Sequence, residues 1–242
     1  MTQIHPVAAR IPYMTAIGNH EYDYIGQPFA PSWGNYGQDS HGECGVPFLH
    51  RFQMPWHAPD QPYFSYEFAN IFFILISTEH DWLPGSQQHN WMISTLKSVD
   101  RARTPWVIVG GHRPMYSSAH IAPKAERLAT FNIASHMREA FSDMFREFKV
   151  DLALWGHIHA YERTCAVYHE KCHPEGTVHL TIGMAGKSMI GANEWVEPPP
   201  EWSLKRGRSY GYSVITTTAT SLHFQLIDND NGQVLDEMTL TK

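Results

Sequence analysis

The sequence predicts a single α/β domain that contains two β-sheets. Apolar runs of strand length alternate with two segments of helical periodicity as far as Thr164, and only short β-like runs follow. A chain of 242 residues is long enough to bury one substantial core. We therefore expect residues 1–242 to form one domain, whose C-terminal part is rich in strands from residue 165 onward.

The expected strands before Thr164 are apolar runs, several of which end in Gly, His or acidic residues. They cover residues 11–17, 63–67, 71–77, 106–109 and 150–155. Ser86 is expected to cap a helix that continues to Val99. A second helix is expected over Ala134–Lys149, because large apolar residues recur there on one helical face. These residues are Met137, Phe141, Met144, Phe145 and Phe148.

The C-terminal part is expected to be built from strands alone. These strands cover residues 178–182, 212–218, 222–227 and 234–240, and the turn sequence Asp228-Asn229-Asp230-Asn231-Gly232 separates the last two. Residues 26–62 differ from both parts, because they are rich in Gly, Pro, Trp and His and show no sustained period. We expect them to form a long functional loop or cap.

The composition favours a folded enzyme-like domain. Hydrophobic residues make up 43% of the chain and charged residues 17%. Sixteen histidines favour a metal or phosphate site, and the net charge of -6 argues against a nucleic-acid partner. No apolar run approaches the ~20 residues that span a bilayer, so no membrane partner is expected. Residues 1–10 lack the apolar core of a secretory signal.

The three cysteines leave one thiol without a partner. Cys165 and Cys172 are seven residues apart, and we expect them to close a hairpin as a disulfide, with three free thiols as the alternative. Cys44 is then unpaired. No C-x-x-C pair occurs, which argues against a zinc finger.

Three of the expected strands are followed by a glycine and then by Asn or His, which are residue types that bind metals. They carry Asn19, His112 and the pair His157 and His159. Two imidazoles one residue apart, where a strand ends, can face the same ions, and such nitrogen and oxygen ligands suit zinc, manganese or iron. A metal there would orient a phosphoryl oxygen and activate water.

Further histidines are expected close to the substrate of this site. We expect His20 and His120 to donate hydrogen bonds to the substrate or to protonate the leaving oxygen. The expected partner is a small phosphate ester. For any single histidine a structural role is the alternative.

These motifs, in this order and spacing, resemble those of the calcineurin-like metallophosphoesterases. The continuation Ala160-Tyr161-Glu162-Arg163-Thr164 resembles the purple acid phosphatases in particular. The resemblance implies a metallophosphoesterase-type β-sandwich flanked by helices, with the metals at the strand ends. It also implies a metal-dependent acid phosphatase that hydrolyses phosphate monoesters and is secreted or vacuolar.

The resemblance further implies a dinuclear centre of iron with zinc, manganese or iron. Asn19, His112 and His157 would hold the divalent metal, and His159 would belong to the iron(III) position. His20 would contact phosphate.

One part of the family pattern is missing from the chain. The family carries two earlier motifs, an Asp and a Gly-Asp-x-x-Tyr, whereas no Asp or Glu occurs between Met1 and Ile17. We therefore expect the N-terminal strands of the fold to be missing and Met1 to be an internal methionine of a longer protein. The ligands present then serve one metal site and part of the second. The alternative is a degenerate, non-catalytic phosphatase-like binding module.

Two other site types are disfavoured, and the oligomeric state stays open. Gly183-Met184-Ala185-Gly186-Lys187-Ser188 resembles a nucleotide-binding P-loop, but Thr181 stands where its first glycine belongs and no helical pattern follows. A metalloprotease is disfavoured because no H-E-x-x-H motif occurs.

Overall fold

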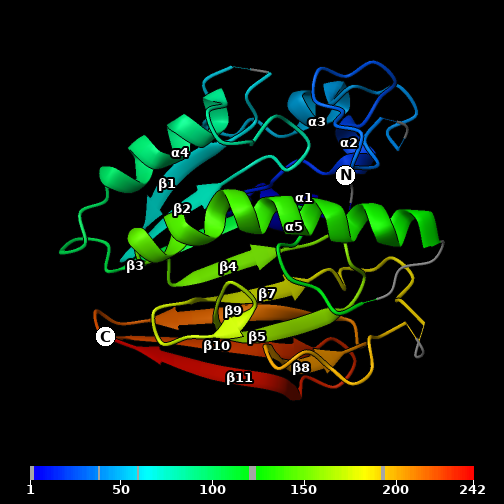
Figure 1. Ribbon diagram of the computed structural model, residues 1–242. Helices are drawn as coiled ribbons and strands as arrows, with labels where there is room; N and C mark the ends of the chain where they lie inside the picture. Colours follow the sequence, from blue (N-terminus) through cyan, green and yellow to red (C-terminus); the bar gives the residue numbers. More distant parts are fainter. Residues whose placement is uncertain (1–2, 38, 59, 120–123, 192–193) are drawn as a thin grey trace.

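Two β-sheets pack against each other, and the two longest helices cover the outer face of the larger one (Figure 1). The computed structural model describes residues 3–37, 39–58, 60–119, 124–191 and 194–242. Within these residues the larger sheet has eight strands, in the order β1-β2-β3-β4-β7-β5-β6 with β8 paired to β5. Their bounds are β1 Phe64–Phe68, β2 Ile71–Leu75, β3 Trp106–Gly111, β4 Leu152–Trp155, β5 Tyr161–Tyr168, β6 Lys171–Cys172, β7 Thr177–Ile182 and β8 Ser203–Gly207.

The centre of the larger sheet is parallel. Strands β2, β3, β4 and β7 run in the same direction, with Gly111 opposite Trp155 in the β3–β4 register. The carboxyl ends of parallel strands meet at one edge of the sheet, so the loops that follow these strands lie together. This edge carries the His112 and His157 loops.

The smaller sheet is antiparallel and covers one face of the larger sheet. It consists of β9 (Gly211–Thr217), β10 (Ser221–Asp228) and β11 (Val234–Thr241), in the order β11-β10-β9. Every second residue of β10 is buried, and Phe224 and Leu226 pack against Ile108 and Leu180 of the larger sheet. The β-sandwich expected from the sequence is therefore confirmed.

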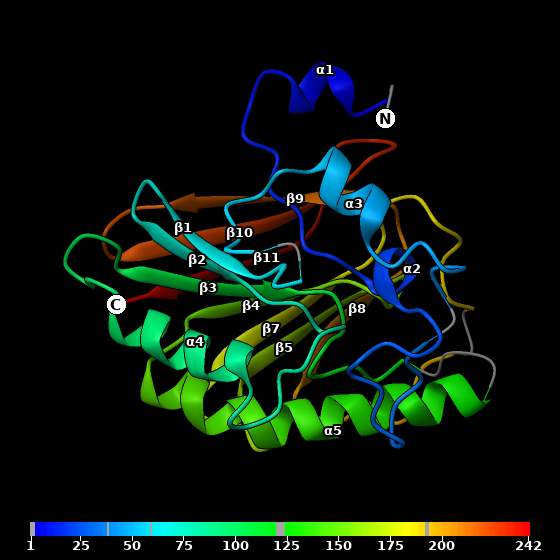
Figure 2. The ribbon, with the colours of Figure 1, turned by 90° about the horizontal axis from the view of Figure 1, so that it is seen from above.

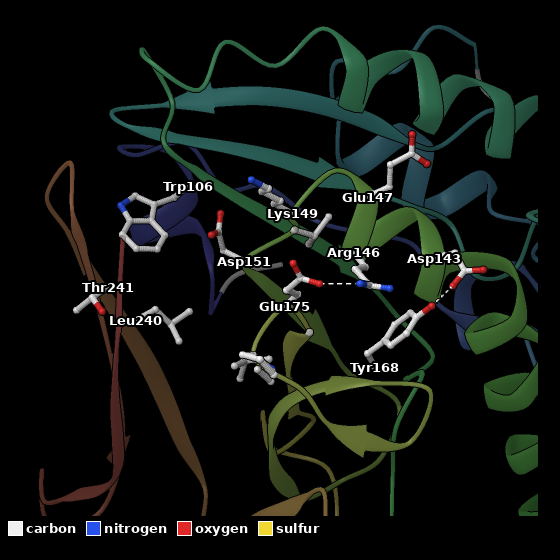
Figure 3. Close-up of a pocket in the computed structure, with 15 residues that line it drawn as sticks. Trp106, Asp143, Arg146, Glu147, Lys149, Asp151, Tyr168, Glu175, Leu240 and Thr241 are labelled. Atoms are coloured by element: carbon white, nitrogen blue, oxygen red, sulfur yellow. Dashed lines mark hydrogen bonds and ion pairs between the residues drawn. The ribbon is translucent and has the colours of Figure 1, made fainter.

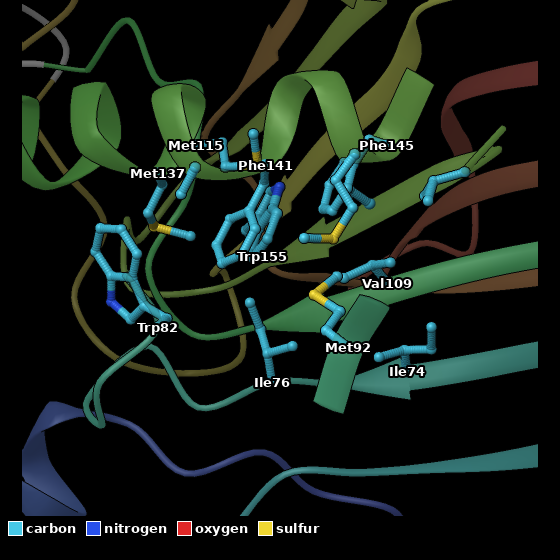
Figure 4. Close-up of a cluster of buried hydrophobic side chains, with 14 of the residues drawn as sticks. Ile74, Ile76, Trp82, Met92, Val109, Met115, Met137, Phe141, Phe145 and Trp155 are labelled. Atoms are coloured by element: carbon cyan, nitrogen blue, oxygen red, sulfur yellow. The ribbon is translucent and has the colours of Figure 1, made fainter. Parts of the chain in front are cut away.

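Helices α4 (Gln87–Lys97) and α5 (Lys124–Glu147) cover the opposite face of the larger sheet (Figure 2). Alternate residues of the parallel strands point into this layer, because successive side chains of a strand face opposite sides. Figure 4 shows Ile74 and Val109 beside Met92 of α4, in a cluster that also contains Phe141 and Phe145 of α5. The apolar face expected in the second helix is buried here.

Short helices occur in the N-terminal quarter, where loops dominate. They are α1 (His5–Ala8), α2 (Asn19–Tyr22) and α3 (Val46–Arg51). The long loop expected over residues 26–62 is confirmed apart from α3 and an isolated β-bridge. Among the described residues no helix is both long and apolar enough to cross a bilayer.

Three expectations about single elements were wrong or incomplete. Residues 11–17 do not form a strand: Pro12 has no N–H, and the Thr15 N–H contacts the sulfur of Met54 at 3.4 Å instead of a neighbouring strand. Helix α5 begins at Lys124 and not at Ala134, because Ala, Glu, Arg and Leu favour helix even where the apolar pattern is weak. Strand β8 was not predicted, because most of its residues are polar and show no apolar alternation.

The Cys165–Cys172 disulfide is present, as expected. It joins β5 to β6 across the hairpin, with an S–S distance of 2.06 Å. Cys44 is a free thiol. The hairpin also contacts α5, where the Tyr168 hydroxyl donates to Asp143 at 2.7 Å.

The packing of the core predicts that replacing a buried phenylalanine lowers the free energy of unfolding far more than replacing an exposed one. Phe141 is 1% exposed and Phe68 is 63% exposed. Phe141→Ala should lower the free energy of unfolding by about 3–5 kcal/mol, because it leaves a cavity. Phe68→Ala should change it by less than about 0.5 kcal/mol. Urea unfolding measures both, and equal losses would contradict the packing described.

Candidate metal centre

Three side chains from separate loops converge at the carboxyl edge of the parallel strands. Asn19 begins α2, His112 follows β3 and His157 follows β4. His112 Nε2 lies 2.6 Å from Asn19 Oδ1 and 3.2 Å from His157 Nδ1. The sequence predicted these residues as ligands of one metal, and the structure brings all three together.

The backbone fixes this convergence. The Gly156 N–H donates to the His112 carbonyl at 2.9 Å, which extends the β3–β4 pairing beyond the last ladder residues. His157 has a φ of 63°, so the chain turns at this residue. Gly18 allows close approach, since a Cβ there would lie 2.8 Å from His112 Nδ1.

The three donor atoms fit a bound cation. Ligands that bind a metal at about 2.1 Å lie about 3.0–3.4 Å from each other. The 3.2 Å between His112 Nε2 and His157 Nδ1 fits this range, and the 2.6 Å between His112 Nε2 and Asn19 Oδ1 requires these two atoms to move apart when a metal binds. The other ring nitrogen of His157, Nε2, is buried and has no hydrogen-bond partner among the described residues. Among the described residues no group of three His, Cys, Asp or Glu side chains could hold a metal ion, and the cluster described here has two histidines and the amide of Asn19.

Both central imidazoles are neutral at pH 7. Burial lowers the pKa of His112 to about 4, although the Glu79 carboxylate acts in the opposite direction. Burial also lowers the pKa of His157 well below its ordinary value, and the Arg113 guanidinium adds to this effect. A neutral imidazole keeps a lone pair, which metal ligation requires.

The other expected site histidines lie around this cluster. His159 Nδ1 lies 2.9 Å from the Ser188 carbonyl, and His20 Nδ1 lies 3.3 Å from the Asp39 carbonyl. A carbonyl only accepts, so each Nδ1 carries the hydrogen and each Nε2 is left for another partner. Among the described residues, neither ring forms a hydrogen bond with Asn19, His112 or His157, although both act electrostatically on His112. His120 lies outside the described residues.

A buried ion network stands directly behind His112 and was not predicted from the sequence. Arg113 is 1% exposed, and its guanidinium donates to Glu79 at 3.0 Å, Asp23 at 2.9 Å and Asn35 at 2.9 Å. It also lies 4.8 Å from the centre of the Tyr36 ring. The network ties the loop after α2 and the end of β2 to the His112 loop.

The carboxyl groups of this network share one cation and differ in protonation. Burial raises the pKa of Asp23 to about 9, and repulsion from Glu79 adds to the rise. Burial also acts to raise the pKa of Glu79, but the Arg113 guanidinium outweighs it, so this pKa lies below its ordinary value. At pH 7 Asp23 is therefore protonated and Glu79 is the charged partner of Arg113.

A cavity of about 830 Å³ lies at the opposite end of the parallel strands and does not belong to this site. Trp106 and Asp151, which line it, lie at the start of β3 and just before β4 (Figure 3). Several of its charged groups are paired: Arg146 contacts Glu175 at 2.7 Å, and Asp151 contacts Arg101 at 3.0 Å. A smaller cavity of about 330 Å³ borders Gly111 and Gly156, which directly precede the two histidines of the Asn19–His112–His157 cluster.

Comparison with family models agrees with this geometry. The family model of the calcineurin-like phosphoesterases matches residues 2–161. The chain belongs to this family. A second model, described as "Iron/zinc purple acid phosphatase-like protein C", matches residues 176–237 and identifies the phosphoesterase as one of the purple acid phosphatase type. The family is a group of metal-dependent phosphoesterases with a dinuclear centre.

Individual relatives are longer than this phosphoesterase chain. It is 38% identical to "Probable inactive purple acid phosphatase 9" of Arabidopsis thaliana over 97% of its own length and 39% of the relative. It is 32% identical to "Nucleotide pyrophosphatase/phosphodiesterase" of Hordeum vulgare, over 98% of its own length and 65% of the relative. The chain thus spans about two fifths of the first of these relatives.

A solved structure has the same fold. The purple acid phosphatase PPD1 from yellow lupin (Lupinus luteus) seeds matches with a TM-score of 0.84 and 31% identity. The match covers 99% of this chain and 42% of the lupin chain. The β-sandwich described above is therefore that of the purple acid phosphatases.

The protonation of the buried network predicts different effects of two amide substitutions. Asp23→Asn replaces a neutral carboxyl and should cost less than about 1 kcal/mol at pH 7. Glu79→Gln removes the charged partner of Arg113, which Asp23 can replace only by losing its proton in a buried position, so this variant should cost more, up to about 3–5 kcal/mol. Urea unfolding measures both, and a larger loss in Asp23→Asn would contradict the assignment.

The same assignment predicts a change in pH dependence. The folded pKa of Asp23, about 9, lies above the unfolded value, so folding retains a proton between pH 4 and 9. Across that window the stability contribution of Asp23 falls as pH rises, by up to about 1.4 kcal/mol per pH unit. Asp23→Asn should remove this decline. If the free energy of unfolding changes with pH in the same way for variant and wild type from pH 5 to 9, Asp23 is not protonated as assigned.

Proposed function

We propose that the chain carries the metal centre of an acid phosphatase that hydrolyses small phosphate monoesters. The convergence of Asn19 Oδ1, His112 Nε2 and His157 at ligand-to-ligand distances carries this proposal. The membership of a phosphoesterase family supports the reaction class. Nitrogen and amide-oxygen donors favour zinc, manganese or iron, and we propose iron together with one of these three metals as the dinuclear pair.

The bound metals would supply Lewis acidity and a water of lowered pKa as nucleophile. Asn19, His112 and His157 would hold the divalent metal, and His159 would present Nε2 to the iron position while Ser188 holds its Nδ1. His20 is exposed beside the cluster, and in its protonated form, with Nδ1 held by the Asp39 carbonyl, its Nε2–H can donate a hydrogen bond to a phosphoryl oxygen. His120 is proposed as a second substrate contact or general acid.

The second candidate function is a non-catalytic phosphatase-like module that keeps the fold and binds phosphate without hydrolysis. The names of its relatives favour it. Four relatives over 30% identical carry names that begin "Probable inactive purple acid phosphatase".

We further propose that the protein is secreted or vacuolar. The Cys165–Cys172 disulfide supports an oxidising compartment, where such bonds persist.

Metal analysis and hydrolysis of 4-nitrophenyl phosphate at mildly acidic pH test the proposal. Wild-type chain should bind metal and turn over the ester. His157→Ala and Asn19→Ala should each reduce metal affinity and turnover by more than about 100-fold. Even the loss of a group that only supports a metal ligand lowers affinity or activity about 10–100-fold. His169→Ala is the matched control: His169 is exposed on the β5–β6 turn and pairs with Asp143, so this variant should behave as wild type.

The two candidate functions give different results in this assay. A folded chain that binds inorganic phosphate but shows no turnover would favour the binding module. Full activity in His157→Ala would reject the metal centre.

A further inference from the structure

The oxygen and the nitrogen of the Asn19 side-chain amide each have a partner: an imidazole nitrogen for the oxygen and a carboxylate for the nitrogen. Oδ1 lies 2.6 Å from His112 Nε2 and so faces the proposed metal position. Nδ2 donates to Asp39 Oδ2 at 2.7 Å on the other side. A carboxylate accepts hydrogen bonds and does not donate them, so Asp39 selects the nitrogen end of the amide.

The orientation of this amide matters because only one end can bind a cation. The oxygen has lone pairs, whereas the NH₂ group presents hydrogens. Rotation about the last side-chain bond of Asn is soft, so the side chain alone does not select one orientation. Asn19 is 4% exposed, so its NH₂ group is buried and Asp39 is its hydrogen-bond partner there.

Asp39 is itself held against the site. Its carbonyl lies 3.3 Å from His20 Nδ1, and the N–H of the next residue, Ser40, donates to the Asp23 carbonyl at 2.9 Å. Asp23 is in turn fixed by Arg113 in the buried network. The segment that carries Asp39 is thus connected to the residue after His112.

We propose that Asp39 is a positioning residue that turns the Asn19 amide oxygen toward the metal. The inference rests on the metal centre proposed above. Asp39 acts through its hydrogen bond to Nδ2, and not as a metal ligand or as a negative charge that attracts the cation.

Three variants separate these roles. Asp39→Ala removes the acceptor and the charge, and Asp39→Asn removes the charge but keeps an acceptor oxygen of the same reach. Asp230→Ala is the control, because Asp230 is an exposed carboxylate in the turn between β10 and β11. Unchanged backbone NMR spectra away from residues 19 and 39 establish that each variant is folded.

The first measurement uses the metal-free chain. The side-chain NH₂ resonances of Asn19 should shift in Asp39→Ala and stay close to wild type in Asp39→Asn and Asp230→Ala. Resonances that do not respond to Asp39→Ala would overturn the inference.

The second measurement is Zn²⁺ titration by calorimetry. Asp39→Ala should bind Zn²⁺ about 10–100-fold more weakly. Asp39→Asn should stay within about 3-fold of wild type, since a neutral acceptor replaces a charged one. In an Asn19→Ala background, Asp39→Ala should cause no further loss, because its effect passes through Asn19.

Two results of the titration would overturn the inference. Equal losses in Asp39→Asn and Asp39→Ala would assign the effect to charge or direct ligation. Full loss from Asp39→Ala in the Asn19→Ala background would show that Asp39 acts independently of Asn19. A wild-type chain that binds no Zn²⁺ would instead contradict the proposed metal centre, and the NMR measurement would still decide whether Asp39 orients the amide.

Discussion

The parallel pairing of β3 with β4 is the constraint on which the site depends. Gly111 lies opposite Trp155, and the bond from the Gly156 N–H to the His112 carbonyl extends the pairing beyond the strands. The two histidine loops therefore leave the sheet at the same level. A shift of one residue in this register would turn the side chains that follow to the opposite face and separate the two imidazoles.

The buried network at Arg113 joins this sheet edge to the loops that surround it. A guanidinium that is 1% exposed is costly to bury unless its partners are fixed, and Glu79 and Asp23 come from two different loops. The position of His112 is thus linked to the loop after α2. Since Asn19 begins α2, the same loop region also carries the third donor atom. Stability and ligand geometry consequently depend on the same contacts.

The sequence could predict the strand ends but not the contacts that support them. Buried parallel strands such as β3 are continuous apolar runs, so Gly111 and His112 were recognisable as the end of a strand. The run at residues 11–17 has the same apolar character, yet an apolar run forms a strand only if a neighbouring strand accepts its hydrogen bonds. Arg113 and Asp23 are 90 residues apart, and no local pattern indicates such a pairing. Asp39 likewise lies in a segment without periodicity.

Diffraction from crystals of the chain grown with Mn²⁺, measured for anomalous scattering, tests the central claim most directly. We expect an anomalous peak within bonding distance of Asn19 Oδ1, His112 Nε2 and an imidazole nitrogen of His157, with or without a second peak next to His159. A well-ordered crystal that shows no peak there, or a peak only at a site away from these three side chains, would contradict it.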